Sequence, residues 1–278
     1  MKTIVQKPDL DTCLTALIMN VQETDEVVCL KGEAPESDLG DQHVLCIEAG
    51  GSGQAALMNF DHHDPARYFP PACLQAYEAK GWQDEGMARL IDYVCLVDER
   101  PTDHPRIAFP SLSNLFSGML LVEKDAVTQF RAGMVLLRTV RQDGLDPFVT
   151  MPDRDEWRPW RLAKEENLKR VMETAVKARF HTTQSGLRIG FLESNAVGGT
   201  GSLFAQGCRV AILSNPAFGV PPLPKYTIAG NGVAVSGLLP HLDRLEKGWG
   251  GRETIIGSPR MGSVLTPAQV MEQVSKHL

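Results

Sequence analysis

The sequence lacks any segment suited to a membrane or to secretion. No run of about 18 uncharged apolar residues occurs in the 278 residues, so no membrane span is predicted. The N-terminal segment turns polar directly after Ile4 and Val5, which is not the pattern of a signal peptide. We therefore expect a cytoplasmic protein that makes no membrane contact.

Paired cysteines and common nucleotide motifs are also missing. The six cysteines form no C-x-x-C motif, and most lie inside apolar runs, which favours free thiols over a disulfide frame or a zinc site. No Gly-x-Gly string follows the first predicted strand, so a Rossmann dehydrogenase is not expected. A net charge of −6 argues against duplex DNA, whose binding needs many cationic phosphate contacts.

What is present is a large apolar fraction and an uneven charge. With 43% hydrophobic residues, the chain can bury one large core or two ordinary ones. Residues 1–183 carry twenty basic and twenty-nine acidic side chains, and residues 184–278 carry eight and five. An acidic part can hold divalent cations and a basic part an anion, although ordinary surface variation would give the same numbers.

Alternating patterns predict an α/β protein of two domains. Residues 1–100 alternate short apolar runs with helical patterns, which indicates a mostly parallel sheet flanked by helices. Residues 111–141 are predicted to be helical, and 153–180 to form a connecting helix kinked by Pro159. Shorter strands separated by glycine-rich turns follow. We expect a catalytic-type domain over 1–150, a helical linker over 151–184, and a smaller mixed-sheet domain over 185–278.

Acidic residues follow two of the predicted strands. Asp9 and Asp11 come after the strand that ends near Val5, and Glu48 closes the buried run 44–47. Taken alone, these residues do not indicate a functional site, because Asp11 is a good N-cap for the helix predicted from Thr12 and Asp9 can be solvated.

The segment Asp61-His62-His63-Asp64 is less common, since two histidines flanked by carboxylates suit Mn²⁺ or a similar metal. Asp98 ends a predicted helix, where a negative charge is unfavourable unless a cation lies nearby. That cation is either a metal ion or the neighbouring Arg100. Because residues just past parallel strands converge on one crevice, we expect these groups to share a metal site.

These residues resemble the motifs of the DHH phosphoesterase superfamily, in its exopolyphosphatase and oligoribonuclease-like branch. Asp9-x-Asp11, Glu48, Asp61-His62-His63 and Asp98 match the order and spacing of the four N-terminal motifs. Gly250-Gly251-Arg252, followed by Gly257-Ser258-Pro259-Arg260, is similar to the glycine-rich signature of the family's C-terminal substrate domain.

The resemblance implies a role for each matched residue. Asp9 would bind a first metal ion, and Asp11, His62 and Asp98 a second, with Glu48 bridging the two Mn²⁺ or Mg²⁺ ions. Asp61 would orient an imidazole, and His63 would face the scissile phosphate. The residues that would hold a substrate phosphate are Gly250, Gly251, Arg252 and Arg260.

The sequence departs from the family at the first metal site. A histidine normally precedes the first aspartate by two or three residues, where this chain has Gln6 and Lys7. An aspartate is usual at the position of Glu48. We expect either that the Lys7 ammonium supplies the missing positive charge, leaving one firmly held ion, or that Lys7 points to solvent.

Two other features have competing interpretations. Trp157 and Trp160, among arginines, are expected to pack at a helix start, with a stacking strip for single-stranded nucleic acid as the alternative. Residues 198–201, Gly-Gly-Thr-Gly, are expected to form a tight turn rather than a phosphate loop. We treat His181, His241 and His277, which have no partners at ligand spacing, as structural.

The leading expectation is a metal-dependent phosphohydrolase. Its substrate would be small and phosphorylated: a short oligonucleotide, a dinucleotide, a nucleotide bisphosphate or polyphosphate. Short single-stranded nucleic acid is a candidate partner, and a homodimer is compatible with the sequence. The alternative is a nucleotide- or phosphate-binding module that has lost the first metal site and with it the catalytic activity.

Overall fold

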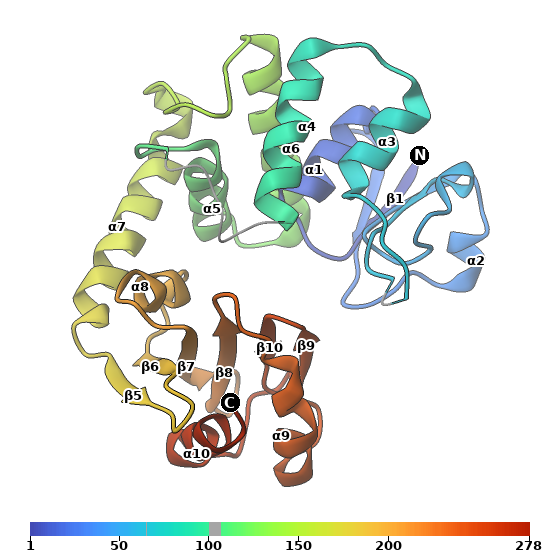
Figure 1. Cartoon of the computed structure of the whole chain (residues 1–278). Coiled ribbons are helices and arrows are strands. Elements are labelled where there is room, and N and C mark those ends of the chain that lie inside the picture. The colour runs from blue at the N-terminus through green and yellow to red at the C-terminus, as the bar shows by residue number, and fades with distance from the viewer. Residues whose placement is uncertain (65, 100–106) are drawn as a thin grey trace. The chain divides into compact units, whose positions relative to one another are not determined.

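The computed structural model describes residues 1–64, 66–99 and 107–278, and Arg100 lies outside these ranges. The chain divides into two compact units, Met1–Lys164 and Glu165–Leu278 (Figure 1). All six cysteines are free, as expected. Within the described residues, no helix combines the length and apolar character that crossing a membrane requires.

The N-terminal unit contains a four-stranded parallel sheet in the order β2-β1-β3-β4. Its strands are β1 (Lys2–Val5), β2 (Glu26–Cys29), β3 (Val44–Ile47) and β4 (Asn59–Phe60). The apolar runs become strands because both faces of a parallel sheet are covered, and β3 is buried throughout its length. The predicted α/β class and parallel sheet are confirmed.

Helices pack on this sheet and form the core of the unit. They are α1 (Leu10–Ile18), α2 (Glu36–Leu39), α3 (Ala72–Lys80), α4 (Glu85–Glu99), α5 (Leu112–Val122) and α6 (Ala126–Gln142). Ser111 caps α5 and Asp125 caps α6 through their side chains, as their positions before apolar periodic segments predict. Helices α2 and α3 were not expected, because neither carries a strong apolar periodicity.

The connecting helix is shorter than the sequence indicates. Helix α7 spans Arg158–Ala175, and a 3₁₀ turn at Asp155–Trp157 precedes it. Pro159 lies in the first turn of α7, where a proline removes no helical hydrogen bond, so the prediction of a kink at Pro159 is wrong. Phe180 belongs to a strand rather than to the helix.

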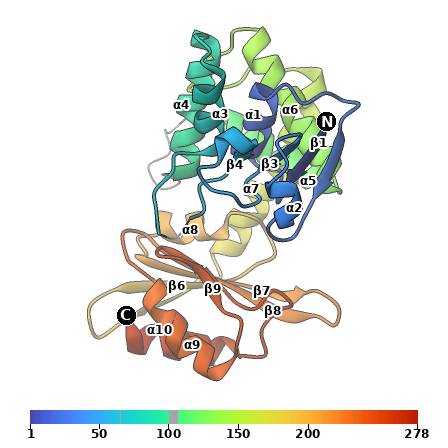
Figure 2. The ribbon, with the colours of Figure 1, turned by 90° about the vertical axis from the view of Figure 1, so that its right-hand side faces the viewer.

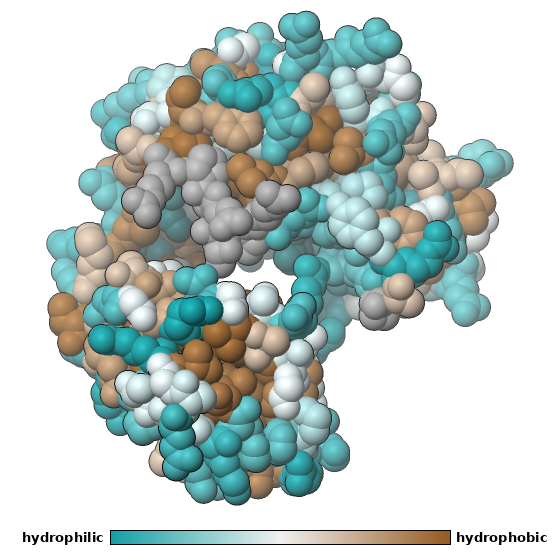
Figure 3. All heavy atoms as spheres, viewed as in Figure 1, coloured by the Kyte–Doolittle hydropathy of each residue, from teal (hydrophilic) through white to brown (hydrophobic). Residues whose placement is uncertain are grey.

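The C-terminal unit is built on a six-stranded mixed sheet in the order β5-β6-β7-β8-β10-β9 (Figure 1). Its strands are β5 (Arg179–Thr182), β6 (Arg188–Glu193), β7 (Val210–Phe218), β8 (Leu223–Gly230), β9 (Gly250–Arg252) and β10 (Ile255–Gly257). The helices are α8 (Gly199–Ala205), α9 (Leu239–Leu245) and α10 (Pro267–His277). Figure 2 shows two of these helices, α9 and α10, together on one side of the sheet. Only β6 and β7 pair in parallel, so the predicted mixed sheet is confirmed. Figure 3 shows apolar side chains in the middle of this unit's near face, bordered by hydrophilic ones.

Two glycine-rich segments differ from expectation. Residues 198–201 open helix α8, with Gly198 in the left-handed region at φ 97°, so they are a helix start rather than a tight turn. Gly250 and Gly251, expected in a turn, lie in strand β9.

The tryptophan pair packs in the N-terminal unit. Trp157 is only 2% exposed, and Trp160 packs against the same apolar core, which confirms the packing interpretation. Because the Trp157 ring is buried, the alternative of a stacking strip for single strands at this pair is wrong.

Candidate metal centre

The turn after β1 places two aspartates in different environments. Asp9 is the N-cap of α1, because its carboxylate accepts a hydrogen bond from the Thr12 N–H at 2.9 Å. Asp11, expected to be the cap, lies inside the helix and is 1% exposed. Its two carboxylate oxygens accept the N–H groups of Ala72 (2.8 Å) and Cys73 (2.7 Å). Asp11 therefore holds the start of α3 against α1.

Lys7 forms an ion pair with Asp9 while remaining largely in solvent. Its Nζ lies 3.0 Å from Oδ2 of Asp9, and 72% of its side chain is exposed. The Asp9 carboxylate raises the pKa of Lys7, so the ammonium stays charged at neutral pH. Lys7 thus brings a positive charge to Asp9 and also reaches into water, while its replacement of a metal ion at the first site stays a prediction.

Glu48 leaves β3 in an uncommon backbone conformation. Its φ is +50°, a region that costs a non-glycine residue energy and often marks a functional position. The side chain is 4% exposed and is held at both oxygens: the Thr12 hydroxyl donates to Oε2 at 3.0 Å, and the Nε2 atom of His62 lies 3.0 Å from Oε1.

Asp61 organises the loop around the histidines. It accepts hydrogen bonds from the Gly50 N–H (2.9 Å), the Ser52 hydroxyl (2.7 Å) and the His63 N–H (2.6 Å). Burial raises the pKa of Asp61, but the interactions with His63 and the other donors outweigh it and hold the pKa well below its usual range. Asp61 is therefore a stable carboxylate, and its Oδ1 lies 3.6 Å from Nδ1 of His63.

The two histidines that follow β4 differ in exposure. The side chain of His62 is 9% exposed, and its Nε2 lies 3.4 Å from Oδ2 of Asp98 in the last turn of α4. The side chain of His63 is 39% exposed, with Nδ1 3.8 Å from Oε1 of Glu48. His62 is therefore enclosed among carboxylates, whereas His63 reaches solvent.

Two groups of side chains offer ligand atoms within 4.8 Å of one another. One group is Asp11, His62 and Asp98, and the other is Glu48, His62 and His63. His62 belongs to both. Asp9 is in neither of these two groups formed by the described residues, and its carboxylate is turned to Thr12 and Lys7.

The buried carboxylates carry more negative charge than their neighbours neutralise. Burial raises the pKa of Asp11 to about 7, and the charge of Glu48 adds to this effect. Burial also raises the pKa of Glu48, although His62 and His63 oppose it. Burial lowers the pKa of His62, but Glu48 and Asp98 outweigh it and raise the pKa above its ordinary value. A divalent cation would remove the repulsion that these shifts reflect.

The glycine-rich hairpin lies in the other unit. Gly250, Gly251 and Arg252 form the exposed edge strand β9, which pairs only with β10 in this sheet. Gly251 has φ +149°, and a Cβ there would lie 2.6 Å from Cα of Ile256, so only glycine fits. Arg260 is exposed beyond β10 and lowers the pKa of Lys225, after burial as the main cause. Lys225 of β8 and Arg260 therefore lie close enough to each other for their charges to interact.

Comparison with known proteins identifies the fold. No family model and no curated protein matches the sequence. A solved pGpG-specific phosphodiesterase, PggH from Vibrio cholerae, matches with a TM-score of 0.65 over 99% of this chain and 98% of its own, at 12% identity. A DHH domain described as a member of the s1p family of ribosomal proteins matches with a TM-score of 0.51 over 99% of this chain and 86% of its own, at 11% identity. The chain has the DHH fold. The resemblance stated from the sequence is thereby confirmed for the fold.

The sequence analysis did not identify every residue that supports the candidate metal centre. Thr12, which holds Glu48, was seen only as the start of a helix, and Ser52 only as part of a flexible loop. Neither has a sequence signal beyond its proximity to Asp11 and Glu48.

In the C-terminal unit, His241 and His277 stack with ring centres 3.5 Å apart. This is a contact between α9 and α10 that the spacing of the two residues in the sequence does not reveal.

Proposed function

We propose that this protein is a divalent-metal-dependent phosphoesterase that hydrolyses a phosphodiester or phosphoanhydride bond in a small phosphorylated substrate. The observation that carries the proposal is the convergence of Asp11, His62 and Asp98, from three separate segments, to ligand atoms within 4.8 Å. The DHH fold supports it, and in the sequence these three residues resemble the family's metal motifs.

The donor set fits a divalent ion such as Mn²⁺ or Mg²⁺. Carboxylate and imidazole donors suit Mn²⁺, and a cation would stabilise the ionised form of Asp11, whose pKa is raised mainly by burial. Asp11, His62 and Asp98 would hold one ion, and Glu48 with His63 would hold or bridge to a second. When bound, such an ion supplies an activated water and stabilises negative charge on the phosphoryl oxygens.

The other residues would position and neutralise the substrate. Asp61, kept ionised by its three donors, fixes the backbone of His63 and thereby aims its exposed ring. His63 would then donate a hydrogen bond to the reacting phosphate. Lys7, charged and exposed beside Asp9, would supply positive charge where the family usually has a histidine.

The substrate would be a short nucleotide, with a linear dinucleotide as the first candidate. One structural neighbour is described as specific for pGpG. The edge strand with Gly250, Gly251 and Arg252, together with Arg260, would hold a substrate phosphate, since backbone N–H groups and guanidinium forks suit that anion. We assign the catalytic part to residues 1–150, the connection to 151–184, and substrate binding to 185–278.

One observation favours a second candidate function, a binding module without turnover. Asp9 is already engaged by Lys7 and by the Thr12 N–H, so it has less capacity for a first metal ion. A chain with one incomplete site would bind a nucleotide and leave it intact.

Hydrolysis of pGpG separates these two functions. The full chain would be assayed with Mn²⁺, with Mg²⁺ and with EDTA, beside Asp98→Asn and the matched variant Asp92→Asn. Asp92 is an exposed carboxylate on the same helix and outside both ligand groups. We expect metal-dependent turnover that Asp98→Asn abolishes and Asp92→Asn retains. Tight nucleotide binding without turnover on any of the substrate classes above would favour the module.

A further inference from the structure

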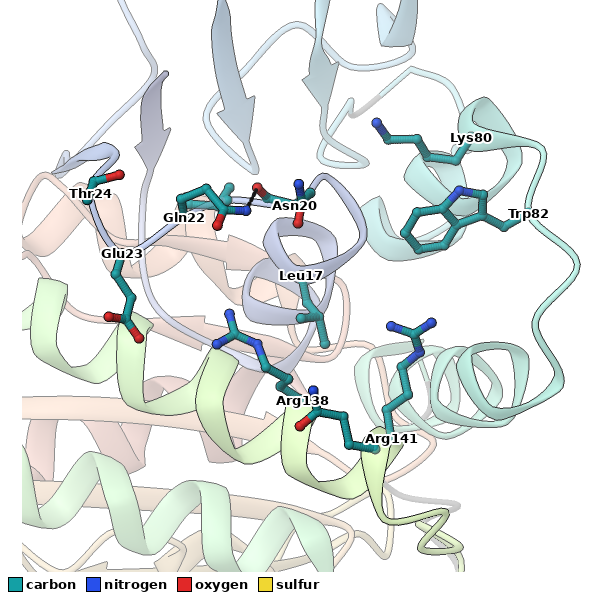
Figure 4. A pocket seen from close by; sticks show the side chains of 11 residues that line it. Leu17, Asn20, Gln22, Glu23, Thr24, Lys80, Trp82, Arg138 and Arg141 are labelled. Carbon is teal, nitrogen blue, oxygen red and sulfur yellow. Dashed lines mark hydrogen bonds between the residues drawn. The ribbon is translucent and has the colours of Figure 1, made fainter.

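A second cavity lies in the N-terminal unit, at the opposite end of α1 from the metal centre. Its volume is about 680 Å³, which is within the usual range for small-molecule sites. Figure 4 shows Arg138 and Arg141 projecting from α6, with Lys80 and Trp82 facing them from the end of α3. Because α1 has nine residues, about 13 Å of helix separates this cavity from Asp9.

The lining of this cavity is basic although its surroundings are acidic. Residues 1–164 contain sixteen basic and twenty-six acidic side chains, yet the lining contains Lys80, Arg138 and Arg141 against a single carboxylate, Glu23. Arg141 pairs with Asp84 at 2.6 Å. Within the described part of the chain, Lys80 and Arg138 form no ion pair, so the lining keeps an excess of positive charge (Figure 4).

Helix capping does not account for these cations. Three helices end at the cavity, and the negative end of a helix dipole attracts cations. Some of their last carbonyl groups already accept backbone N–H groups, namely those of Met19, Asn20 and Val21 at α1, Gly81 at α3, and Asp143, Gly144 and Leu145 at α6. Within the described residues, neither Lys80 nor Arg138 donates a hydrogen bond to a helix carbonyl. In addition, Arg138 and Arg141 are three residues apart on one helix face, where like charges repel. An anion between the helices would relieve this repulsion.

The cavity also has a partly exposed aromatic ring beside its cations. Trp82 is only partly buried, and the guanidinium of Arg141 lies 5.9 Å from its ring centre. The amides of Gln22 and Gln142, in the same lining, can pair with polar groups of a ligand. We propose that this cavity binds a nucleoside monophosphate, with the base against Trp82 and the phosphate on Lys80 and Arg138. This site is independent of the metal centre and does not rest on the proposed enzymatic function.

Calorimetric titration with GMP tests this site directly. The full chain would be titrated in EDTA, so that the metal centre cannot contribute, and GMP would be compared with guanosine and with inorganic phosphate. We expect GMP to bind, and guanosine and phosphate each to bind at least about tenfold more weakly. Guanosine lacks the phosphate that would contact the two cations, and inorganic phosphate lacks the base that would contact Trp82. Quenching of tryptophan fluorescence by GMP should disappear in Trp82→Phe.

Charge-removing variants decide where the ligand sits. The double variant Lys80→Gln/Arg138→Gln should weaken GMP binding at least about tenfold, because charge-assisted hydrogen bonds to the phosphate are lost. The control Lys169→Gln removes an exposed lysine from the other unit and should bind as the wild type does. Thermal melting would show that the variants are folded. Absence of GMP binding at millimolar concentration, or equal binding by the double variant, would overturn the proposal.

Discussion

The two ends of helix α1 carry opposite charge and differ in burial. At its start, Asp11 and Glu48 are almost fully buried, and among the residues that the structure describes the cationic groups close to them are imidazoles and one exposed lysine. At its end, Lys80 and Arg138 reach solvent beside Trp82. The helix dipole favours acidic groups at the start of a helix and cationic groups at its end, but by only about 0.3–1 kcal/mol at each end. Burial makes the larger difference, since repulsion among buried charges is screened far less than among exposed ones.

The comparison teaches that only one end requires a ligand. A buried carboxylate whose pKa is raised to about 7 lacks a sufficient counter-charge, so a cation would stabilise the fold at this end. The cations at the other end are more exposed, so solvent screens their mutual repulsion and an anion there would stabilise the fold less. We therefore expect the metal to affect stability as well as activity, and a nucleotide at the second cavity to affect stability little.

The largest effect should come from His62→Ala, because His62 belongs to both ligand groups. Loss of a side chain that holds a metal should lower Mn²⁺ affinity by at least about 100-fold, more than changes in outer-shell partners do. Calorimetric titration of the metal-free chain measures this effect. The matched variant His63→Ala leaves Asp11, His62 and Asp98 in place and should lose less affinity. Equal losses in the two variants would contradict the central position of His62.

A change in the middle of α1 should affect the whole unit. Leu14 is fully buried between the two ends, and Leu14→Ala should lower the free energy of unfolding by about 2–5 kcal/mol through lost contacts and a cavity. Urea denaturation of the metal-free chain measures this. Val135→Ala on α6, at a side chain that is 46% exposed, is the control and should change stability by less than about 0.5 kcal/mol.

A smaller effect is expected from Thr12→Val, which keeps the shape of the side chain and removes its hydroxyl. Glu48 would lose the donor at 3.0 Å that fixes its Oε2. Loss of such a supporting contact should reduce Mn²⁺ affinity by about tenfold, while GMP binding at the other end of α1 stays unchanged. A parallel loss in both titrations would mean that the variant damages the fold instead.

The smallest effect concerns the pH dependence of stability at the second cavity. The hydrogen bond from Arg141, followed by that from the Met87 N–H, lowers the pKa of Asp84. A lowered pKa contributes stability above the unfolded value of about 3.9, and this stability is lost as the pH falls through the folded value. Asp84→Asn keeps the acceptor for Met87 and removes the charge. It should cost about 0.2–1 kcal/mol at pH 7 and less at pH 3, as urea denaturation at both values would show.

Much of the metal centre could be predicted because its residues sit at the ends of strongly patterned elements. The runs at β1 and β3 and the periodicity of α4 placed Asp11, Glu48 and Asp98 at element ends, and parallel strands bring such ends together. The apolar run at β4 likewise placed His62 just past the end of a strand. What the pattern could not show is which aspartate caps α1, because Asp9 and Asp11 are equally good N-caps by residue type.

The second cavity and the C-terminal hairpin depend on tertiary contacts. Lys80 and Trp82 lie far from Arg138 in the sequence and carry no motif, so only the packing of α3 and of α6 on α1 reveals that they line one cavity. Gly250 and Gly251 have the composition of a turn, yet pairing with β10 makes them a strand. Local propensity was overridden there by a partner strand that the sequence does not mark.

The central claim is that Asp11, His62 and Asp98 hold a divalent cation, and Mn²⁺ titration of the purified, metal-free chain by calorimetry tests it most directly. The account predicts one or two ions bound at micromolar affinity, with the tighter binding lost in Asp98→Asn and kept in Asp92→Asn. Failure of the folded wild-type chain to bind Mn²⁺ or Mg²⁺, or unchanged binding in Asp98→Asn, would contradict it.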